Sequence, residues 1–87
     1  MTLSEAIKNR INELLKINKM NINTLANNAG ISSSTIRSIM KGKCKTPTAL
    51  TLYYICIAFN ITLSEFYNSD LFNIDNINED SKIVYVK

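Results

Sequence analysis

Residues 22 to 39 read Ile22-Asn-Thr-Leu-Ala-Asn-Asn-Ala-Gly-Ile-Ser-Ser-Ser-Thr-Ile-Arg-Ser-Ile39, and they form the most informative pattern in the chain. Its first half places small or apolar residues at the spacing of one helix face: Leu25, Ala26 and Ala29. Gly30 follows at once, where a chain leaving a helix often needs a positive φ, which glycine adopts at little steric cost. Ser32 can then cap a second helix by accepting a backbone N–H bond. The stretch therefore predicts two short helices joined by a glycine turn.

The two predicted helices cross closely. The side chain of Ile31 is expected to lie in the core, and Ile36 and Ile39 are the inward residues of the second helix. Ala26 is small because helices that cross steeply at close range leave no room for a larger side chain. This is the pattern of a helix-turn-helix, an arrangement that presents the exposed face of its second helix to the DNA major groove.

Length and composition limit what else the chain can be. Its 87 residues make one domain, with a modest core and no room for a deep substrate cavity. No apolar run approaches the ~20 residues that a membrane span needs, and charged residues from Glu5 onward argue against a signal peptide. Cys44 and Cys56 have no second pair and no histidine beside them. We therefore expect reduced thiols, no metal site and a cytoplasmic location.

The charge is unevenly distributed. Residues 1–67 hold six lysines and two arginines against three glutamates, a net +5, whereas residues 68–87 hold four acids against two lysines, a net −2. The basic charge is concentrated just after the second helix of the predicted motif, at Arg37, Lys41, Lys43 and Lys45. A cluster in that position suits a polyanion.

Caps and apolar spacing predict five helices. Thr2 and Glu5 have the spacing of a capping box ahead of a helix over 3–18, whose apolar face is Leu3, Ile7, Ile11, Leu14 and Leu15. The next two helices follow caps at Asn21 and Ser32; they run to residue 28 or 29 and to about residue 41. Thr48 caps a fourth helix through Phe59, and Thr62 caps a short fifth helix over 63–67, with Leu63 and Phe66 facing inward.

The sequence therefore predicts a compact all-α, five-helix domain over residues 1–67, followed by a C-terminal tail over 68–87. The helical period is lost after Tyr67. The last six residues alternate as an edge strand does, so the end of the tail is either strand-like, pairing with its copy in a dimer, or frayed. We expect the tail to be partly ordered against the fourth helix.

From Ile11 to Tyr67, the chain resembles the Cro/C1-type (XRE) helix-turn-helix regulators of phages, plasmids and bacteria. The residues that carry the resemblance are Leu25-Ala26, Gly30-Ile31-Ser32, Ser34-Thr35-Ile36, Gly42, Pro47 and the closing stretch 55–66. The resemblance implies a lambda-repressor-like fold and a double-stranded DNA partner. It also implies a transcriptional regulator, most often a repressor, that binds without a cofactor.

The resemblance also assigns roles to residues. It makes Ser33, Ser34 and Ser38 the readers of base edges, with Arg37 on the same exposed side, able to reach a guanine edge or a phosphate. Four residues are expected to contact DNA phosphates: Thr35, Lys41, Lys43 and Lys45. The alternative for the serines is a capping or surface role, which we favour for Ser32 alone.

One such module buries little DNA, so useful affinity usually comes from a homodimer on two half-sites. Tyr54 and Ile57 lie one turn apart on the fourth helix, with Tyr53 nearby. Exposed apolar groups at this spacing suggest a dimer contact or a docking surface for the tail, and covering the domain's own core is an equal alternative.

Two other classes of function remain to be weighed. An enzyme is disfavoured because the chain has no histidine to act as general base and only two glycines, too few for a phosphate-binding loop. We predict no catalytic residue, no metal and no small-molecule ligand. The stronger competitor is a protein-interaction module on the same fold, antitoxin-like or regulator-binding, with weak or no DNA binding.

Overall fold

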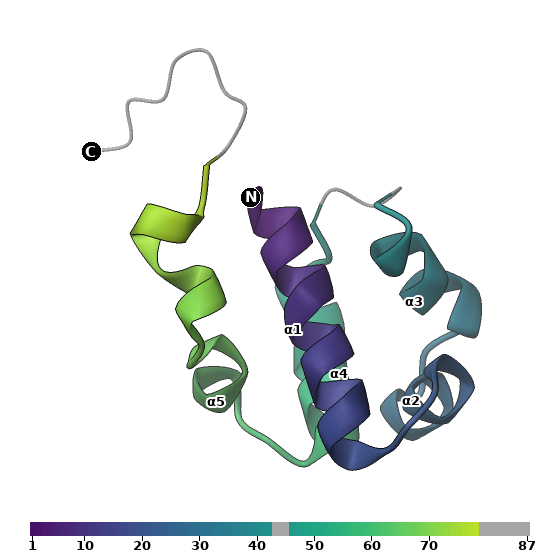
Figure 1. The fold of residues 1–87 in the computed structure, drawn as a ribbon. Coiled ribbons are helices and arrows are strands. Elements are labelled where there is room, and N and C mark those ends of the chain that lie inside the picture. The colour runs from purple at the N-terminus through teal and green to yellow at the C-terminus, as the bar shows by residue number, and fades with distance from the viewer. Residues whose placement is uncertain (43–45, 79–87) are drawn as a thin grey trace.

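The computed structural model describes residues 1–42 and 46–78, and within them the chain is all-helical (Figure 1). The five α-helices are α1 (Leu3–Asn18), α2 (Ile22–Ala29), α3 (Ser33–Met40), α4 (Ala49–Phe59) and α5 (Leu63–Tyr67). Two single-turn 3₁₀ helices follow, η1 (Asp70–Phe72) and η2 (Ile74–Asn76). The predicted all-α class and five helices are therefore confirmed.

Each α-helix begins directly after the residue that the sequence predicts as its cap. The side chains of five residues accept the backbone N–H three positions later: Thr2, Asn21, Ser32, Thr48 and Thr62. Each cap thereby satisfies a backbone donor that the helix itself leaves unpaired. α1 and α5 carry complete capping boxes, in which Glu5 and Glu65 accept the backbone N–H of Thr2 and Thr62, each at 2.8 Å.

One core joins all five helices. It contains four predicted inner residues of α1, namely Ile7, Ile11, Leu14 and Leu15, and four residues of α4, namely Leu52, Ile55, Cys56 and Phe59, all buried. α2 packs against both α3 and α4. Two inward predictions are wrong, because Leu3 is 36% exposed and Leu63 is 38% exposed. Each is the first residue of its helix, directly after the cap, where the turn lies at the edge of the core.

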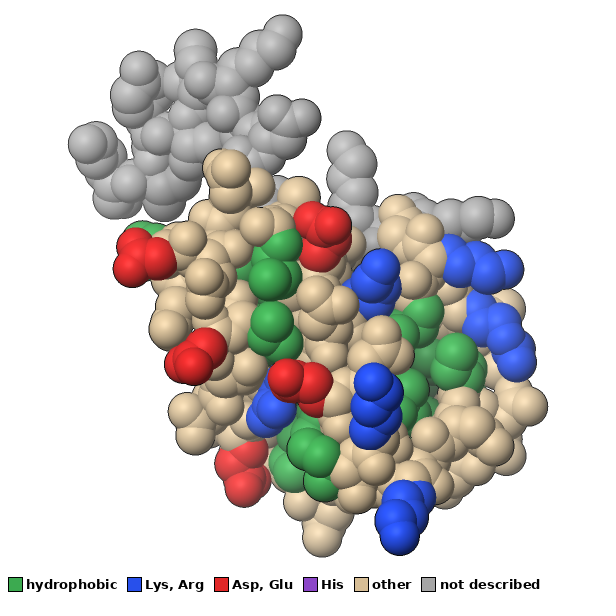
Figure 2. Space-filling view, viewed as in Figure 1, with side chains coloured by type: hydrophobic (Ala, Val, Ile, Leu, Met, Phe, Trp, Pro, Cys, Tyr) green, Lys and Arg blue, Asp and Glu red, His purple; other side chains and the backbone are tan. Residues whose placement is uncertain are grey.

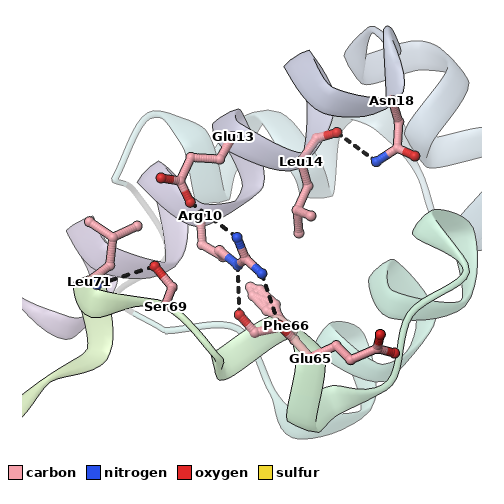
Figure 3. A network of polar contacts seen from close by, with 8 residues as sticks. All are labelled: Arg10, Glu13, Leu14, Asn18, Glu65, Phe66, Ser69 and Leu71. Atoms are coloured by element: carbon pink, nitrogen blue, oxygen red, sulfur yellow. Dashed lines mark hydrogen bonds and ion pairs between the residues drawn. The ribbon is translucent and has the colours of Figure 1, made fainter.

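The described part of the tail, residues 68–78, packs against a different helix from the one we expected. η1 contacts α1 rather than lying on α4, and the Phe72 ring packs 5.9 Å from Phe66 and 4.9 Å from Tyr67. The Met1 ammonium donates to the Asn76 carbonyl oxygen at 3.1 Å, which brings the N-terminus beside η2. Figure 3 shows the polar contacts that join Arg10 of α1 to α5, and the bond from the Leu71 N–H to the Ser69 hydroxyl within this segment. The strand-like stretch 82–87 lies outside the described residues.

Candidate nucleic-acid interface

The α2–turn–α3 unit is built as the sequence predicts. Gly30 ends α2 with φ 72°, and the Ile31 N–H donates to the Ala26 carbonyl at 3.1 Å, which closes the turn. Ala26 is 3% exposed, and Ile36 of α3 is fully buried. With its apolar side locked into the core, α3 has one orientation, and its polar side faces outward.

The outward side of α3 carries four of the predicted site residues. They are Ser34, Arg37, Ser38 and Lys41, spaced at i, i+3, i+4 and i+7, so they lie along one face of the helix. Ser34, Arg37 and Lys41 are exposed, and Ser38 is half-buried. This stripe, called the α3 stripe below, is an open, polar and convex surface.

Two predicted residues lie beside the α3 stripe. Ser33 is half-buried at the first turn. Thr35 is exposed, and its hydroxyl lies 2.8 Å from the Ser32 hydroxyl, which also lies 3.1 Å from that of Ser34. Ser32 accepts the Thr35 backbone N–H as the cap of α3, so its predicted capping role is confirmed. The hydroxyls at this end of α3 therefore form one linked cluster at the surface.

Arg37 has a partner that sequence reasoning missed. Its Nη2 donates to the Asn23 side-chain oxygen on α2 at 3.1 Å. The two residues are 14 positions apart and on different helices, so no spacing within one helix relates them. The link ties the α3 stripe to the exposed start of α2.

A shallow groove lies on the other flank of α3, where α4 begins. It has a volume of about 260 Å³, and its lining comes from both sides of the α3–α4 connection: Thr35, Ser38, Ile39, Thr46, Pro47, Thr48 and Thr51. Its hydroxyl groups are neutral donors and acceptors, and none of the described residues that line it has an ionisable side chain. These hydroxyls therefore continue the polar surface of α3.

The charge around the α3 stripe has one sign. No acidic residue occurs between Glu13 and Glu65, so α2, α3 and α4 contain none. Figure 2 shows most Asp and Glu side chains on the side of α5 and η1, and most Lys and Arg side chains over the centre and the α2–α3 side. Lys43 and Lys45 of the predicted phosphate contacts lie outside the described residues. A surface without negative charge suits the approach of a phosphate backbone.

The comparison with protein families agrees with this geometry. The model of the Cro/C1-type HTH DNA-binding domain matches residues 10–69. The chain belongs to this family. The comparison with curated proteins and that with solved structures gave no match. The matched range ends just before η1, so the segment from Asp70 onward lies outside it.

No three His, Cys, Asp or Glu side chains among the described residues are grouped to hold a metal ion. Cys56 is buried, and burial raises the pKa of its thiol, which works against forming a reactive thiolate. No helix in the described ranges has the length and apolar character to cross a membrane.

The outer face of α4 is the second surface that the sequence singled out. Tyr53 is 49% exposed, Tyr54 38% and Ile57 50%, and Leu50 one turn earlier is 59% exposed. The rings of Tyr53 and Tyr54 lie 5.9 Å apart. These four residues, called the α4 face below, recur at i, i+3, i+4 and i+7 on a helix without a charged residue. The described part of the tail packs on α1 and leaves the α4 face open to solvent.

Proposed function

We propose that this Cro/C1-type domain is a sequence-specific, double-stranded DNA-binding transcriptional regulator. It reads the major groove with α3 and acts as a repressor of phage, plasmid or mobile-element type in the bacterial cytoplasm. The observation that carries this proposal is the α3 stripe, held outward by a buried apolar side and surrounded by a surface that lacks acidic residues.

Arg37 is the strongest candidate for base recognition within the α3 stripe. Its guanidinium can donate two parallel hydrogen bonds to O6 and N7 of guanine, which discriminates this base from the other three. Ser33, Ser34 and Ser38 have hydroxyls that both donate and accept, so they discriminate bases weakly. Their short side chains allow α3 to sit deep in the groove, where DNA shape and ordered water contribute to specificity.

The phosphate contacts are assigned to residues at the edges of α3. Lys41 is exposed at the C-terminal end of α3, and Lys43 and Lys45 follow it in the chain. The Thr35 hydroxyl and the backbone N–H groups at the start of α2 add neutral donors. These contacts fix the register of α3 on the duplex without reading its sequence.

We also propose that two copies bind together and that their contact is the α4 face. An isologous contact places a surface against its own copy, so any charge on it meets a like charge near the two-fold axis. α4 carries no charge, and its exposed side chains are aromatic or aliphatic. A second copy therefore fits this surface without electrostatic repulsion. A different protein as occupant is the alternative that the stoichiometry on DNA would reveal.

The proposal is tested by gel shift on a random AT-rich duplex at low salt, followed by selection of bound sequences from a random pool. We expect a shift that weakens as salt rises. Two matched variants locate the DNA surface, Ser34→Glu and Ser64→Glu. Both are exposed serines at the second position of their helices, α3 and α5.

We expect Ser34→Glu to abolish the shift, because it places a carboxylate in the α3 stripe, and Ser64→Glu to bind as the wild type does. If the two variants bound DNA equally well, α3 would not be part of the DNA-binding surface. Absence of any shift by the folded wild type would instead favour the protein-interaction module.

A further inference from the structure

The contact between Asn23 and Arg37 joins the two helices of the motif on their exposed side. Asn23 is the second residue of α2, and Arg37 lies in the middle of α3. The preceding residue, Ile22, packs against the core, so the chain turns Asn23 outward toward Arg37. The distance of 3.1 Å from Arg37 Nη2 to Asn23 Oδ1 is that of a hydrogen bond.

Asn23 differs from its neighbour Asn21 in what its side-chain oxygen does. The Asn21 oxygen accepts the Thr24 backbone N–H at 2.8 Å and so caps α2. The Asn23 oxygen accepts from Arg37 instead. It takes no part in capping α2, so substituting Asn23 leaves the start of that helix intact.

The partner of Arg37 is a neutral amide, and this affects how the arginine can act. A carboxylate at this place would hold the guanidinium more strongly but would also neutralise its charge. α2 and α3 contain no acidic residue that could do so. Asn23 therefore restricts the guanidinium while leaving its full positive charge for DNA.

We propose that Asn23 is a positioning residue, which fixes the guanidinium of Arg37 in the orientation that reads a base edge. This inference rests on the proposed DNA-reading function. The bond to Asn23 uses one N–H of Nη2, and the remaining donors of the guanidinium stay available for a guanine. Restricting the side chain before binding lowers the entropy lost when Arg37 contacts its base.

The first test needs no DNA. NMR relaxation of the Arg37 side-chain Nε–H in the free protein should show a more restricted group in the wild type than in Asn23→Ala. Asn28→Ala is the control, because it makes the same change at an exposed position of the same helix. Equal Arg37 mobility in the wild type and in Asn23→Ala would overturn the proposal at this step.

The second test is a double-mutant cycle on the duplex that the wild type selects from a random pool, with its single-base variants as competitors. We expect Arg37→Ala to lower the preference at one base pair. Asn23→Ala should lower the preference at that same base pair by roughly three- to tenfold, the equivalent of immobilising one side chain. In the Arg37→Ala background, adding Asn23→Ala should change that preference less than about twofold.

Asn23→Asp separates positioning from charge. The carboxylate keeps an oxygen for Arg37, so the base preference should survive, whereas the added negative charge should weaken binding to every sequence. Asn28→Ala should bind and discriminate as the wild type does.

The outcomes that contradict the proposal are distinct. If Asn23→Ala weakens binding equally for all base variants, with or without Arg37, Asn23 is a phosphate contact and positions nothing. If Arg37→Ala leaves every base preference unchanged, Arg37 reads no base and needs no positioning. In both cases the wild type still binds DNA, so the proposed function survives. A wild type that binds no duplex would remove the proposed function itself and this inference with it.

Discussion

The Arg10 guanidinium holds the C-terminal end of α5 through the carbonyl oxygen of Phe66. Arg10 Nε donates to this oxygen at 2.7 Å, and Arg10 Nη2 donates to the neighbouring Glu65 carbonyl at 2.8 Å (Figure 3). The two bonds use one edge of the planar guanidinium, so they fix both the distance and the angle between α1 and α5. α5 has only five residues, and this link compensates for its few internal hydrogen bonds.

The first prediction concerns this link. Arg10→Lys keeps the positive charge but replaces the planar fork with a single ammonium, which cannot satisfy both carbonyls in the same geometry. We expect the free energy of unfolding, measured by urea titration, to fall by about 1.5–3 kcal/mol, the range for hydrogen bonds that involve a charged group.

Glu13→Gln is the control for the Arg10 variant. It removes the Arg10–Glu13 ion pair, whose atoms are 3.2 Å apart, but leaves both carbonyl bonds in place. The Glu13 side chain is 48% exposed, so we expect a change below about 1 kcal/mol. If Glu13→Gln proved as damaging as Arg10→Lys, the charge pair, and not the fork, would hold α5.

The second prediction concerns the segment after α5. Phe72 packs against the rings of Phe66 and Tyr67, and Phe66 is fully buried. Phe72→Ala should therefore lower the free energy of unfolding by about 1–3 kcal/mol, since it removes a half-buried ring and opens the edge of Phe66 to water. DNA affinity should not change, because this segment is remote from the α3 stripe.

Ile74→Ala controls for a loss of apolar surface nearby. Ile74 lies two residues further along and is 88% exposed, so its truncation should change stability by less than about 0.5 kcal/mol. If the two variants were equally stable, the segment from Asp70 onward would not be part of the folded unit in solution.

The sequence predicted the helices well because their limits depend on neighbours in the chain. A cap such as Thr62 needs only the backbone N–H three residues later, which local geometry guarantees. The positive φ of Gly30 is equally local, because α2 ends at this residue and the chain turns toward α3. The orientation of α3, and hence the exposed stripe, then follows from the apolar spacing alone.

The features that the sequence missed depend on tertiary contacts. The Asn23–Arg37 bond, the Arg10 link to Phe66 and the packing of Phe72 each join parts of the chain that no local pattern relates. The tail was assigned to α4 because that helix has unpaired apolar residues. Phe72 lies instead on the aromatic edge formed by Phe66 and Tyr67, which the short connection through η1 brings within reach.

The third prediction is a loss of stability at alkaline pH. Burial raises the pKa of the Cys56 thiol above its ordinary value. Well below about pH 8.5, the ordinary pKa of a thiol, Cys56 is protonated in both the folded and the unfolded chain, and stability is unaffected. As the pH passes that value, the unfolded thiol loses its proton while the folded one keeps it, so the free energy of unfolding falls as pH rises.

Urea titrations between pH 7 and 10 check this dependence. Cys56→Ala should be less stable at every pH because it leaves a cavity, but its stability should fall less steeply above pH 8.5. If the free energy of unfolding of Cys56→Ala fell with pH as steeply as that of the wild type, the dependence would come from other groups. Tyr67 is one of them, since burial also raises its pKa.

The fourth prediction separates phosphate contacts from base contacts. Lys41→Gln should weaken binding by about the same factor on every duplex sequence, because the lost charge met a phosphate and not a base. The slope of log affinity against log salt should fall by about one unit. Replacing Lys43 or Lys45 by Gln should have the same effect.

Lys16→Gln is the matched control for Lys41→Gln. Lys16 is an exposed lysine of α1 that lies near Arg10 and Asn68, on the side of α5. Because that side faces away from the proposed DNA surface, the slope of log affinity against log salt for Lys16→Gln should equal that of the wild type. A changed base preference with an unchanged salt slope in Lys41→Gln would make Lys41 a reader of bases.

The last prediction concerns the α4 face as the contact between two copies. Two chains on a palindromic site must place their α3 helices about 34 Å apart, one turn of DNA. Ile57→Lys puts a positive charge on each of the two apolar surfaces that the proposed contact brings together. We expect it to bind a single half-site as the wild type does but to lose cooperative binding to two inverted half-sites. Sedimentation equilibrium on the two duplexes measures both the affinity and the number of chains bound.

Ile17→Lys is the control for this variant, since Ile17 is an isoleucine of α1 that is 70% exposed and lies away from α4, near Asn68. It makes the same substitution at a surface to which we assign no partner, so cooperative binding to two inverted half-sites should persist. Because Ile57 is half-exposed, the lysine can reach water and the fold should tolerate it. Loss of cooperativity in Ile57→Lys alone would therefore assign the contact to α4. Wild-type binding of one chain per two-site duplex would show instead that the α4 face serves a different protein.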